Sequence, residues 1–517
     1  MVILSPGTES GTQNDVVFET FNLILKMFTA VDWIVLVAYL LVSLFIGLWV
    51  SRGNKNLKEY MFGGGSMPWV AVGISLIATS VSATTFLGAP ADVYGDDMTF
   101  LMFQIGALIS IFVVGFVFIP RLRSSGISSA YELFEVRFGS RSVRRLAAVF
   151  YCLHLLLRTG ILLYAPSLVL AQILHIDLKV AIVVSAAVAI FYTWFGGIKA
   201  VIWTDVMQFC VFFGGGVLVL LIIASQVGGF GEMATLASEA GKTRWWNPSM
   251  DVSNARTLIS AGFAYAILEI AIRGCDQQFV QRYLSCKDVK AANRSSVLSM
   301  VLGCAVSILF YWVGAALYVY YKKAQVAVLP EGLNQNDVFP YFIVNGLPVG
   351  VTGLIVAAIC AAAMSSLSSS INSLSNTSEH DFLGWDESTG MGGLKRAKIW
   401  TVVWGVLGVF FALFAATQQG SLLKNALFFT GLFTGPLLGM FLLAFFVQGL
   451  KSWQVITAVI CGMISLVLIQ GIPAFGVPAV LGNIFSWPWM PFISMTTTIV
   501  VAVVVNFVAN LVCVKRG

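Results

Sequence analysis

The stretch GISLIATSVSATTFLGAP, residues 73–90, is apolar enough to lie in a membrane yet is crowded with Ser, Thr and Gly. Neighbouring hydroxyl side chains compete with the backbone hydrogen bonds of a helix, and glycine lowers helix propensity further. Helices that break in mid-membrane expose backbone carbonyls and helix ends to an ion or a small molecule. A face of small residues that packs closely against another helix has the same composition. Between these two interpretations we favour the broken helix.

A second polar stretch, AAAMSSLSSSINSLSN (361–376), interrupts another apolar run. It contains the hydroxyls of Ser365, Ser366, Ser368, Ser369 and Ser370. On a helix, residues 365, 368 and 369 share one face. A single intramembrane serine usually bonds to its own helix, but this group forms an oxygen-rich wall, which suits a hard cation. Na⁺ fits better than a divalent ion, because only one carboxylate, Asp205, is available to join these oxygens. Asp205 could instead cap the start of its own helix.

The composition of the whole chain places both stretches in a membrane. Its 517 residues are 58% hydrophobic and 10% charged, against a usual charged share of about 25%. The mean hydropathy is +0.89. A soluble domain could not cover its surface with so few charges, and a disordered chain would lack the many aromatic residues. We therefore predict an all-α integral membrane protein, without a basic block for nucleic acid and without a cysteine or histidine metal site.

Apolar runs long enough to span the bilayer predict about thirteen transmembrane helices. They are 29–50, 68–91, 98–120, 145–173, 178–197, 201–226, 257–278, 294–321, 348–378, 397–418, 422–447, 453–471 and 489–513. Twenty of the 30 lysines and arginines, Arg282 among them, fall in loops on one side of this arrangement. Because basic loops stay in the cytoplasm, we expect a plasma-membrane protein with its N-terminus outside and its C-terminus cytoplasmic.

Few charged residues lie inside these predicted spans. A charge at the bilayer centre costs about 2.5–3.5 kcal/mol on insertion scales, so each of these residues needs an oppositely charged partner or a functional role. Glu269 and Arg273 are four residues apart and can pair on one helix. Asp276 follows at the membrane edge, where water can solvate it. Arg158 has no opposite charge on its own helix. It either pairs across helices, for example with Glu269, or grips the carboxylate of an anionic solute.

With these residues in place, the chain resembles the sodium:solute symporter family from about residue 30 to about residue 450. The motifs that carry the resemblance are EYMFGGGSMPW (59–69), SATTFLGAPADVY (82–94), SSAYELFEVRFG (128–139), YTWFGGIKAVIWTDVMQ (192–208), DQQFVQRYL (276–284) and AAAMSSLSSSINSLSN (361–376). The stretch ILLYAPSLVL (161–170) is most similar to the monocarboxylate, multivitamin and iodide branch. Arg158 before it is more similar to bacterial sialic acid transporters.

The resemblance implies the five-plus-five inverted repeat of the leucine-transporter type. The implied parts are an extracellular segment (1–28), an accessory span with a cytoplasmic loop (29–67), the first repeat (68–226), the second repeat (257–447) and two accessory spans with a short tail (448–517).

The resemblance also implies ligands. For a first Na⁺ these are the backbone carbonyls of Ala78, Val81 and Ala362 and the hydroxyls of Ser365 and Ser366. For a second Na⁺, which only some members bind, they are Asp205, Ser365, Ser368 and Ser369. For the solute they are Ser80, Ser82, Thr85, Gln104 and Arg158.

The implied function is Na⁺-coupled secondary active symport of a small organic solute by alternating access. Arg158 favours an anionic solute, a sialic acid or a monocarboxylate. A neutral sugar or an inorganic anion such as iodide remains an alternative within the family, and a passive channel or facilitator is the alternative class. The partners expected are Na⁺, the solute and the lipid bilayer, with no nucleic acid and no obligate protein partner. No hydrolase motif lies in the spans, so we do not expect an enzyme.

Overall fold

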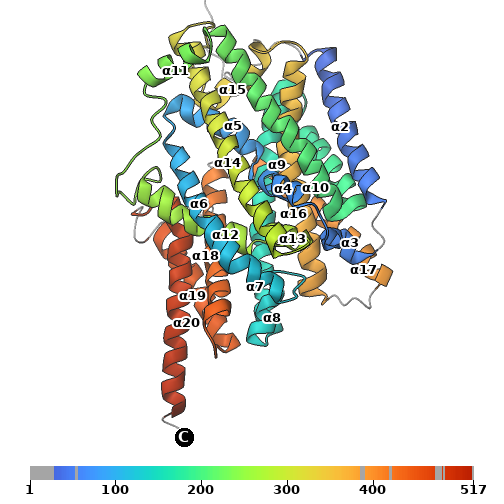
Figure 1. Ribbon diagram of the computed structural model, residues 1–517, viewed down its shortest axis with the longest axis vertical. Helices are drawn as coiled ribbons and strands as arrows, with labels where there is room; N and C mark the ends of the chain where they lie inside the picture. Colours follow the sequence, from blue (N-terminus) through green and yellow to red (C-terminus); the bar gives the residue numbers. More distant parts are fainter. Residues whose placement is uncertain are drawn as a thin grey trace, which may run out of the picture.

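The computed structural model describes residues 28–52, 56–384, 390–417, 422–471, 480 and 484–514. Within these ranges the chain is helical, as predicted, and its only extended pairing is an isolated bridge between Met67 and Cys286. Figure 1 shows the helices gathered into one bundle, with α19 and α20 side by side at one edge. The predicted extracellular segment and the end of the C-terminal tail lie outside the described residues.

The helices have the following bounds in chain order. They are α2 (Ala30–Ser51), α3 (Leu57–Phe62), η1 (Gly63–Gly65), α4 (Trp69–Ser80), α5 (Ala83–Gly95), η2 (Thr99–Met102), α6 (Phe103–Val113), η3 (Val114–Phe118), α7 (Ile119–Ser124), α8 (Glu132–Phe138), α9 (Arg141–Leu174), α10 (Leu178–Gln226), α11 (Phe230–Glu239), η4 (Leu258–Ala264), α12 (Tyr265–Cys275), α13 (Gln277–Ser285), α14 (Val289–Tyr318), η5 (Val319–Lys323), α15 (Gln335–Asn345), α16 (Val351–Thr377), η6 (Ser378–Phe382), α17 (Gly390–Thr417), α18 (Leu422–Phe446), α19 (Ser452–Gln470), η9 (Trp487–Trp489) and α20 (Met490–Val514).

In the described chain, ten helices are long and apolar enough to cross a membrane, and one bent pair of helices makes an eleventh candidate span. The 49 residues of α10 would extend about 74 Å as a single helix, more than twice the hydrocarbon thickness of a bilayer. The backbone of α10 is non-helical at Gly197, the last residue of the predicted span 178–197 and shortly before the predicted span 201–226. The count of thirteen spans stays a prediction.

Gly197 allows the chain to turn inside α10. Its φ of 55° lies in the left-handed region, and a Cβ atom there would lie 2.3 Å from the carbonyl oxygen of Tyr60. The Tyr60 hydroxyl also donates a 3.1 Å hydrogen bond to the Thr193 carbonyl, so α3 is bonded to α10 just before Gly197. Only glycine meets both requirements, the backbone conformation and the close approach.

We therefore expect Gly197→Ala to lower the free energy of unfolding by about 1–3 kcal/mol, because the new methyl group collides with backbone and the residue is strained. Gly214→Ala is the matched control, since a Cβ at Gly214 of the same helix meets no atom within 4 Å. Thermal unfolding of the detergent-purified variants measures the difference. Equal melting temperatures for the two variants would contradict this interpretation of the turn.

Two helices are broken inside the bundle. The helices α4 and α5 meet at an angle of 58°, with Val81 and Ser82 extended between them, which confirms the predicted break in 73–90. The helices α12 and α13 meet at Asp276, whose ψ of 126° is also extended. In the sequence analysis this second break was not expected, and it corrects two expectations. Asp276 is 5% exposed rather than solvated, and Arg282 is 1% exposed rather than part of a surface loop.

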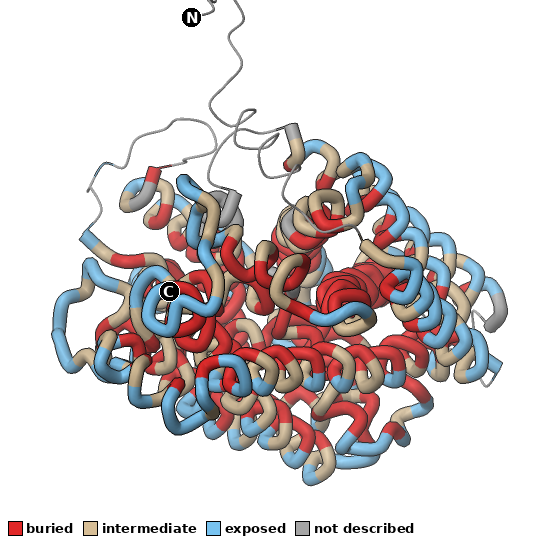
Figure 2. Tube along the Cα trace, turned by 90° about the horizontal axis from the view of Figure 1, so that it is seen from above, coloured by how far each residue is buried: buried red, intermediate tan, exposed pale blue. Residues whose placement is uncertain are grey.

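The serine-rich helix α16 occupies the centre of the molecule. It packs against α10, α9, α2 and α17, and it also contacts α4, α5 and α13 beside the two breaks. From Thr352 onward almost every residue of α16 is buried, and Figure 2 shows the buried segments concentrated inside a ring of exposed ones. Polar side chains on α16 are therefore directed at other helices rather than at lipid.

Candidate functional site

The break between α4 and α5 lies against the serine-rich helix. The Val81 amide makes the last backbone bond of α4, to the Ile77 carbonyl at 2.9 Å, so the carbonyls that follow are outside the helical ladder. The Ser365 hydroxyl donates to the Ala78 carbonyl at 3.1 Å and to the Ala362 carbonyl at 3.2 Å. The Ser366 hydroxyl also donates to the Ala362 carbonyl, at 3.2 Å.

The residues predicted for the first Na⁺ site thus meet at one place. We call Ala78, Val81, Ala362, Ser365 and Ser366 the first cluster. A small cavity of about 10 Å³, close to the volume that holds one water molecule, lies between α4, α10 and α16. Its lining includes Ala78, Val81, Ala362 and Ser365. Buried carbonyl and hydroxyl oxygens around a space of this size suit a dehydrated hard cation.

Gln208 of α10 also lines this cavity and was missed in the sequence analysis. Its side chain is 1% exposed, and neither amide atom has a hydrogen-bond partner among the described residues. A buried amide without a partner is costly, so it indicates a ligand or water in the cavity. The signal was present in the sequence, because Gln208 follows Asp205 by three residues and so lies on the same side of the helix.

The positions predicted for a second Na⁺ are arranged differently. Asp205 is fully buried on α10, and its Oδ2 atom accepts hydrogen bonds from the Ser75 hydroxyl at 2.5 Å and from Nη2 of Arg282 at 3.1 Å. The same Nη2 donates to the Ser369 hydroxyl at 2.6 Å. A guanidinium from α13 therefore bridges the carboxylate and the serine. We call Asp205, Ser369, Ser75 and Arg282 the second cluster.

The two remaining predicted positions bond elsewhere. Ser368 donates to the Ser365 carbonyl at 3.1 Å, along its own helix, and Ser365 belongs to the first cluster. Of the four positions proposed for a second Na⁺, Asp205 and Ser369 are thus joined through Arg282, whereas Ser365 and Ser368 bond to backbone carbonyls. Ser75 and Arg282 were missed as members. The inverted repeat itself offered the signal for Arg282, because the first helix of the second repeat should break as the first helix of the first repeat does.

The residues predicted for the solute lie around the break and beyond it. Ser82 is buried between α4 and α5, and the half-buried Ser80 donates to the Leu76 carbonyl at 3.0 Å, while Thr85 is also half-buried. Gln104 on α6 donates to the Ser307 hydroxyl of α14 at 2.9 Å. Within the described chain no side-chain hydrogen bond joins these predicted solute residues to one another, and the Thr85 amide donates to the Ser82 carbonyl at 2.9 Å.

Arg158 is half-buried on α9, and no hydrogen bond or ion pair to it occurs in the part of the chain that the structure describes. Glu269, its suggested partner, pairs with Arg273 at 2.6 Å and accepts a bond from the Tyr265 hydroxyl at 2.9 Å. The predicted Glu269–Arg273 pair is confirmed, and the alternative pairing of Arg158 with Glu269 was wrong. The buried carboxylate of Asp276 attracts the Arg158 guanidinium electrostatically, without a hydrogen bond between them.

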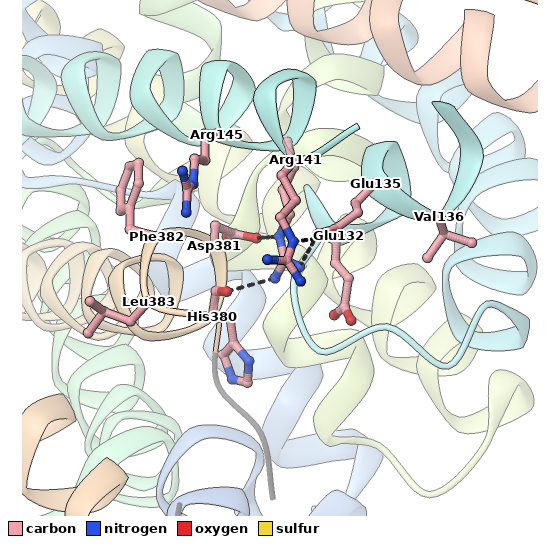
Figure 3. A pocket seen from close by; sticks show the side chains of 11 residues that line it. Glu132, Glu135, Val136, Arg141, Arg145, His380, Asp381, Phe382 and Leu383 are labelled. Carbon is pink, nitrogen blue, oxygen red and sulfur yellow. Dashed lines mark hydrogen bonds and ion pairs between the residues drawn. The ribbon is translucent and has the colours of Figure 1, made fainter. Parts of the chain in front are cut away.

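A charged pocket of about 440 Å³ lies at the start of α9, and none of its lining residues belongs to either cluster (Figure 3). Arg144 donates there to Asp381 at 2.8 Å and to Glu135 at 2.9 Å, so it ties α9 to η6 and α8. Partial burial acts to raise the pKa of Glu135, but the hydrogen bonds from Arg144 and Arg141 outweigh it and lower that pKa. The pocket is the surface of an ion-pair network that joins three elements.

Comparison with known proteins identifies the family of the chain. The model of the sodium:solute symporter family matches residues 60–462. The sodium/sialic acid symporter SiaT of Proteus mirabilis (strain HI4320) is 34% identical over 446 residues, which cover 85% of this chain and 89% of that protein. The sodium-coupled monocarboxylate transporter 1 of Mus musculus is 31% identical over 445 residues, covering 84% of this chain and 72% of that protein.

Solved structures extend the comparison to the fold. A Na⁺-coupled sialic acid symporter in a substrate-bound outward-open state has a TM-score of 0.81 at 31% identity, covering 93% of this chain and 98% of that one. MHP1, a nucleobase-cation-symport-1 family transporter, has a TM-score of 0.57 at 15% identity and shares the fold. The predicted all-helical inverted-repeat fold is confirmed. With a family model that covers most of its length and a relative 34% identical along 85% of it, this multi-pass membrane protein belongs to the sodium:solute symporter family.

Proposed function

We propose that the protein is a Na⁺-coupled symporter that imports a small organic anion, a sialic acid or a monocarboxylate, by alternating access. The observation that carries the proposal is the first cluster, where Ala78 and Val81 at the break and Ser365 of α16 line a cavity of about 10 Å³. Membership of the family and the sodium-coupled relatives support the same function.

The first cluster suggests how Na⁺ and solute are coupled. An ion held there draws together the Ala78 carbonyl on one side of the break and the Ser365 hydroxyl on α16. Fixing the break also fixes Ser82 and Thr85, which begin α5 and which we assign to the solute site. Two ligands that favour the same arrangement bind with positive and reciprocal coupling. The membrane potential adds about 2.3 kcal/mol per charge per 100 mV to inward movement of the cation.

Arg158 is the reason to prefer an anionic solute. Its guanidinium presents parallel N–H groups that match a carboxylate, and a half-buried position strengthens the attraction. Sialic acids and monocarboxylates share this carboxylate. The hydroxyls of Ser80 and Ser82 near the break can bond to a hydroxylated solute. A sialic acid would use these hydroxyls together with Arg158, whereas a monocarboxylate would rely on Arg158.

We expect Arg158→Ala to weaken binding of the carboxylate solute by roughly tenfold to a hundredfold, because a hydrogen bond to a charged group contributes about 1.5–3 kcal/mol. Arg158→Lys keeps the charge but loses the parallel pair of bonds, so it should restore only part of the affinity. Arg141→Ala is the matched control on the same helix, where the arginine side chain is 79% exposed. Isothermal titration with N-acetylneuraminic acid and with pyruvate measures the affinities.

The test of the function itself compares solute binding in Na⁺ and in K⁺ buffer of equal ionic strength. Positive coupling predicts that one of these carboxylates binds at least tenfold more tightly in Na⁺. Affinities that are equal in the two buffers would favour the passive facilitator. Tight Na⁺-dependent binding of a neutral sugar, with no carboxylate bound, would retain symport but reject the role of Arg158.

A further inference from the structure

We propose that Arg282 is a tethered cation that occupies the second Na⁺ position, so that this state of the protein binds a single Na⁺, at the first cluster. The inference rests on the proposed Na⁺ coupling and adds to it the number of ions and the residue that sets this number. It follows from the contacts of one buried guanidinium with two of the residues expected to hold an ion.

The contacts of Arg282 are those of a bound cation. Its Nη2 atom lies 3.1 Å from Oδ2 of Asp205 and 2.6 Å from the Ser369 hydroxyl. Its Nε atom donates to the Ser75 hydroxyl at 2.7 Å. Its Nη1 atom donates to the Gln278 carbonyl at 2.8 Å, which fixes the side chain to its own helix. All three guanidinium nitrogens are therefore engaged, and two of their acceptors are predicted Na⁺ ligands.

Charge makes the guanidinium and a second Na⁺ alternatives. Asp205 and Arg282 are 0% and 1% exposed, and together they are neutral. Adding Na⁺ beside them would place two cations against one carboxylate, where water cannot screen their repulsion. Oδ1 of Asp205 has no hydrogen-bond partner among the described residues, so the carboxylate can take another cation once the guanidinium leaves.

The position of Arg282 on α13 suggests what its ion pair with Asp205 does during transport. Arg282 lies on α13, after the break at Asp276, whereas its three side-chain acceptors, Ser75, Asp205 and Ser369, lie on α4, α10 and α16. A carrier that returns without cargo must not bury a bare carboxylate, because an isolated buried charge is costly. Arg282 neutralises Asp205 without an ion from solution. The coupling ion then needs to fill the first cluster alone.

The experiment counts Na⁺ ions by equilibrium binding of ²²Na⁺ to the purified full-length protein, with solute absent. We expect one Na⁺ per chain for the wild type and two for Arg282→Met, which keeps the length of the side chain but removes the charge. We also expect Na⁺ to raise the melting temperature of Arg282→Met more than that of the wild type, because the ion then replaces the lost partner of Asp205.

The double variant Asp205→Asn with Arg282→Met is the control for folding, since it removes both charges together. It should bind one Na⁺, and its melting temperature should respond to Na⁺ as the wild type does. If Arg282→Met is recovered folded only in Na⁺ while the double variant folds in K⁺, the proposal is supported. Two ions bound by the wild type, or one by a folded Arg282→Met, would overturn it while leaving symport intact. A wild type that binds no Na⁺ would reject the proposed function as well.

Discussion

Replacing Ser365 by alanine is expected to raise the Na⁺ concentration for half-maximal solute uptake by about tenfold to a hundredfold. The Ser365 hydroxyl lies between the Ala78 and Ala362 carbonyls and is 2% exposed, so no water molecule in free exchange can take its place. A polar contact with a charged partner is worth about 1.5–3 kcal/mol, which corresponds to this change in affinity. Uptake of the identified carboxylate into proteoliposomes, measured over a range of external Na⁺ concentrations, gives the Na⁺ concentration for half-maximal uptake.

Ser375→Ala is the matched control for this prediction. It makes the same substitution in the same helix, but the Ser375 hydroxyl faces α17, where it donates to the Ala397 carbonyl at 2.7 Å. We expect its Na⁺ dependence to match that of the wild type. If the alanine variants at 365 and 375 had the same Na⁺ dependence, the first cluster would not be the place where the ion is held.

The second large effect is expected from Asp205→Asn, which should lower the free energy of unfolding by about 3–5 kcal/mol. This is the usual penalty for removing one partner of a buried ion pair, because the other charge stays buried without compensation. Here the charge left behind belongs to Arg282, which is 1% exposed. The measurement is the melting temperature of the purified variant in K⁺ buffer.

Adding Arg282→Met to Asp205→Asn should restore most of this loss, since a neutral pair of similar volume carries no buried charge. Arg141→Ala provides the comparison with an exposed ion pair, because Arg141 pairs with Glu135 while 79% of its side chain is exposed. Exposed pairs contribute little to stability, so that variant should melt close to the wild type. An Asp205→Asn variant as stable as Arg141→Ala would mean that the pair of Asp205 and Arg282 is not formed in the protein.

The first cluster was accessible from sequence because its signals are local. The break shows in the composition of residues 73–90, and the serines repeat with helical spacing on α16. Each half was recognisable alone, and the family resemblance supplied the pairing of the two. The break confirmed at Val81 and Ser82 lies inside the predicted stretch.

The second cluster could not be predicted from local sequence patterns. Members that bond directly to one another are separated by up to 207 residues, as Ser75 and Arg282 are, so no local pattern joins them. Arg282 lies in QQFVQRYLS (277–285), which hydropathy assigns to a loop because it is mostly polar. Only tertiary packing buries this short helix beside α4 and α16. For the same reason the ion pair of Asp205 with Arg282 was not expected, since Arg282 had been counted outside the membrane.

Two of the predicted spans, 178–197 and 201–226, lie in the single element α10 for a geometrical reason. A tight turn at Gly197, where the backbone is non-helical, lets two helices follow one another without a loop. The turn has no Pro or polar linker in its sequence, only the pair Gly196 and Gly197. Apolar periodicity predicted the two segments but could not indicate how closely they are joined.

Simultaneous measurement of ²²Na⁺ and labelled carboxylate entering the same proteoliposomes tests the central claim most directly. With an inward Na⁺ gradient and a negative interior, the account predicts concentrative solute uptake accompanied by about one Na⁺ per solute molecule. Replacing external Na⁺ by K⁺ should abolish concentrative uptake. Solute entry at the same rate in K⁺, or entry without accompanying ²²Na⁺, would contradict the coupling of cation and solute at the broken helix.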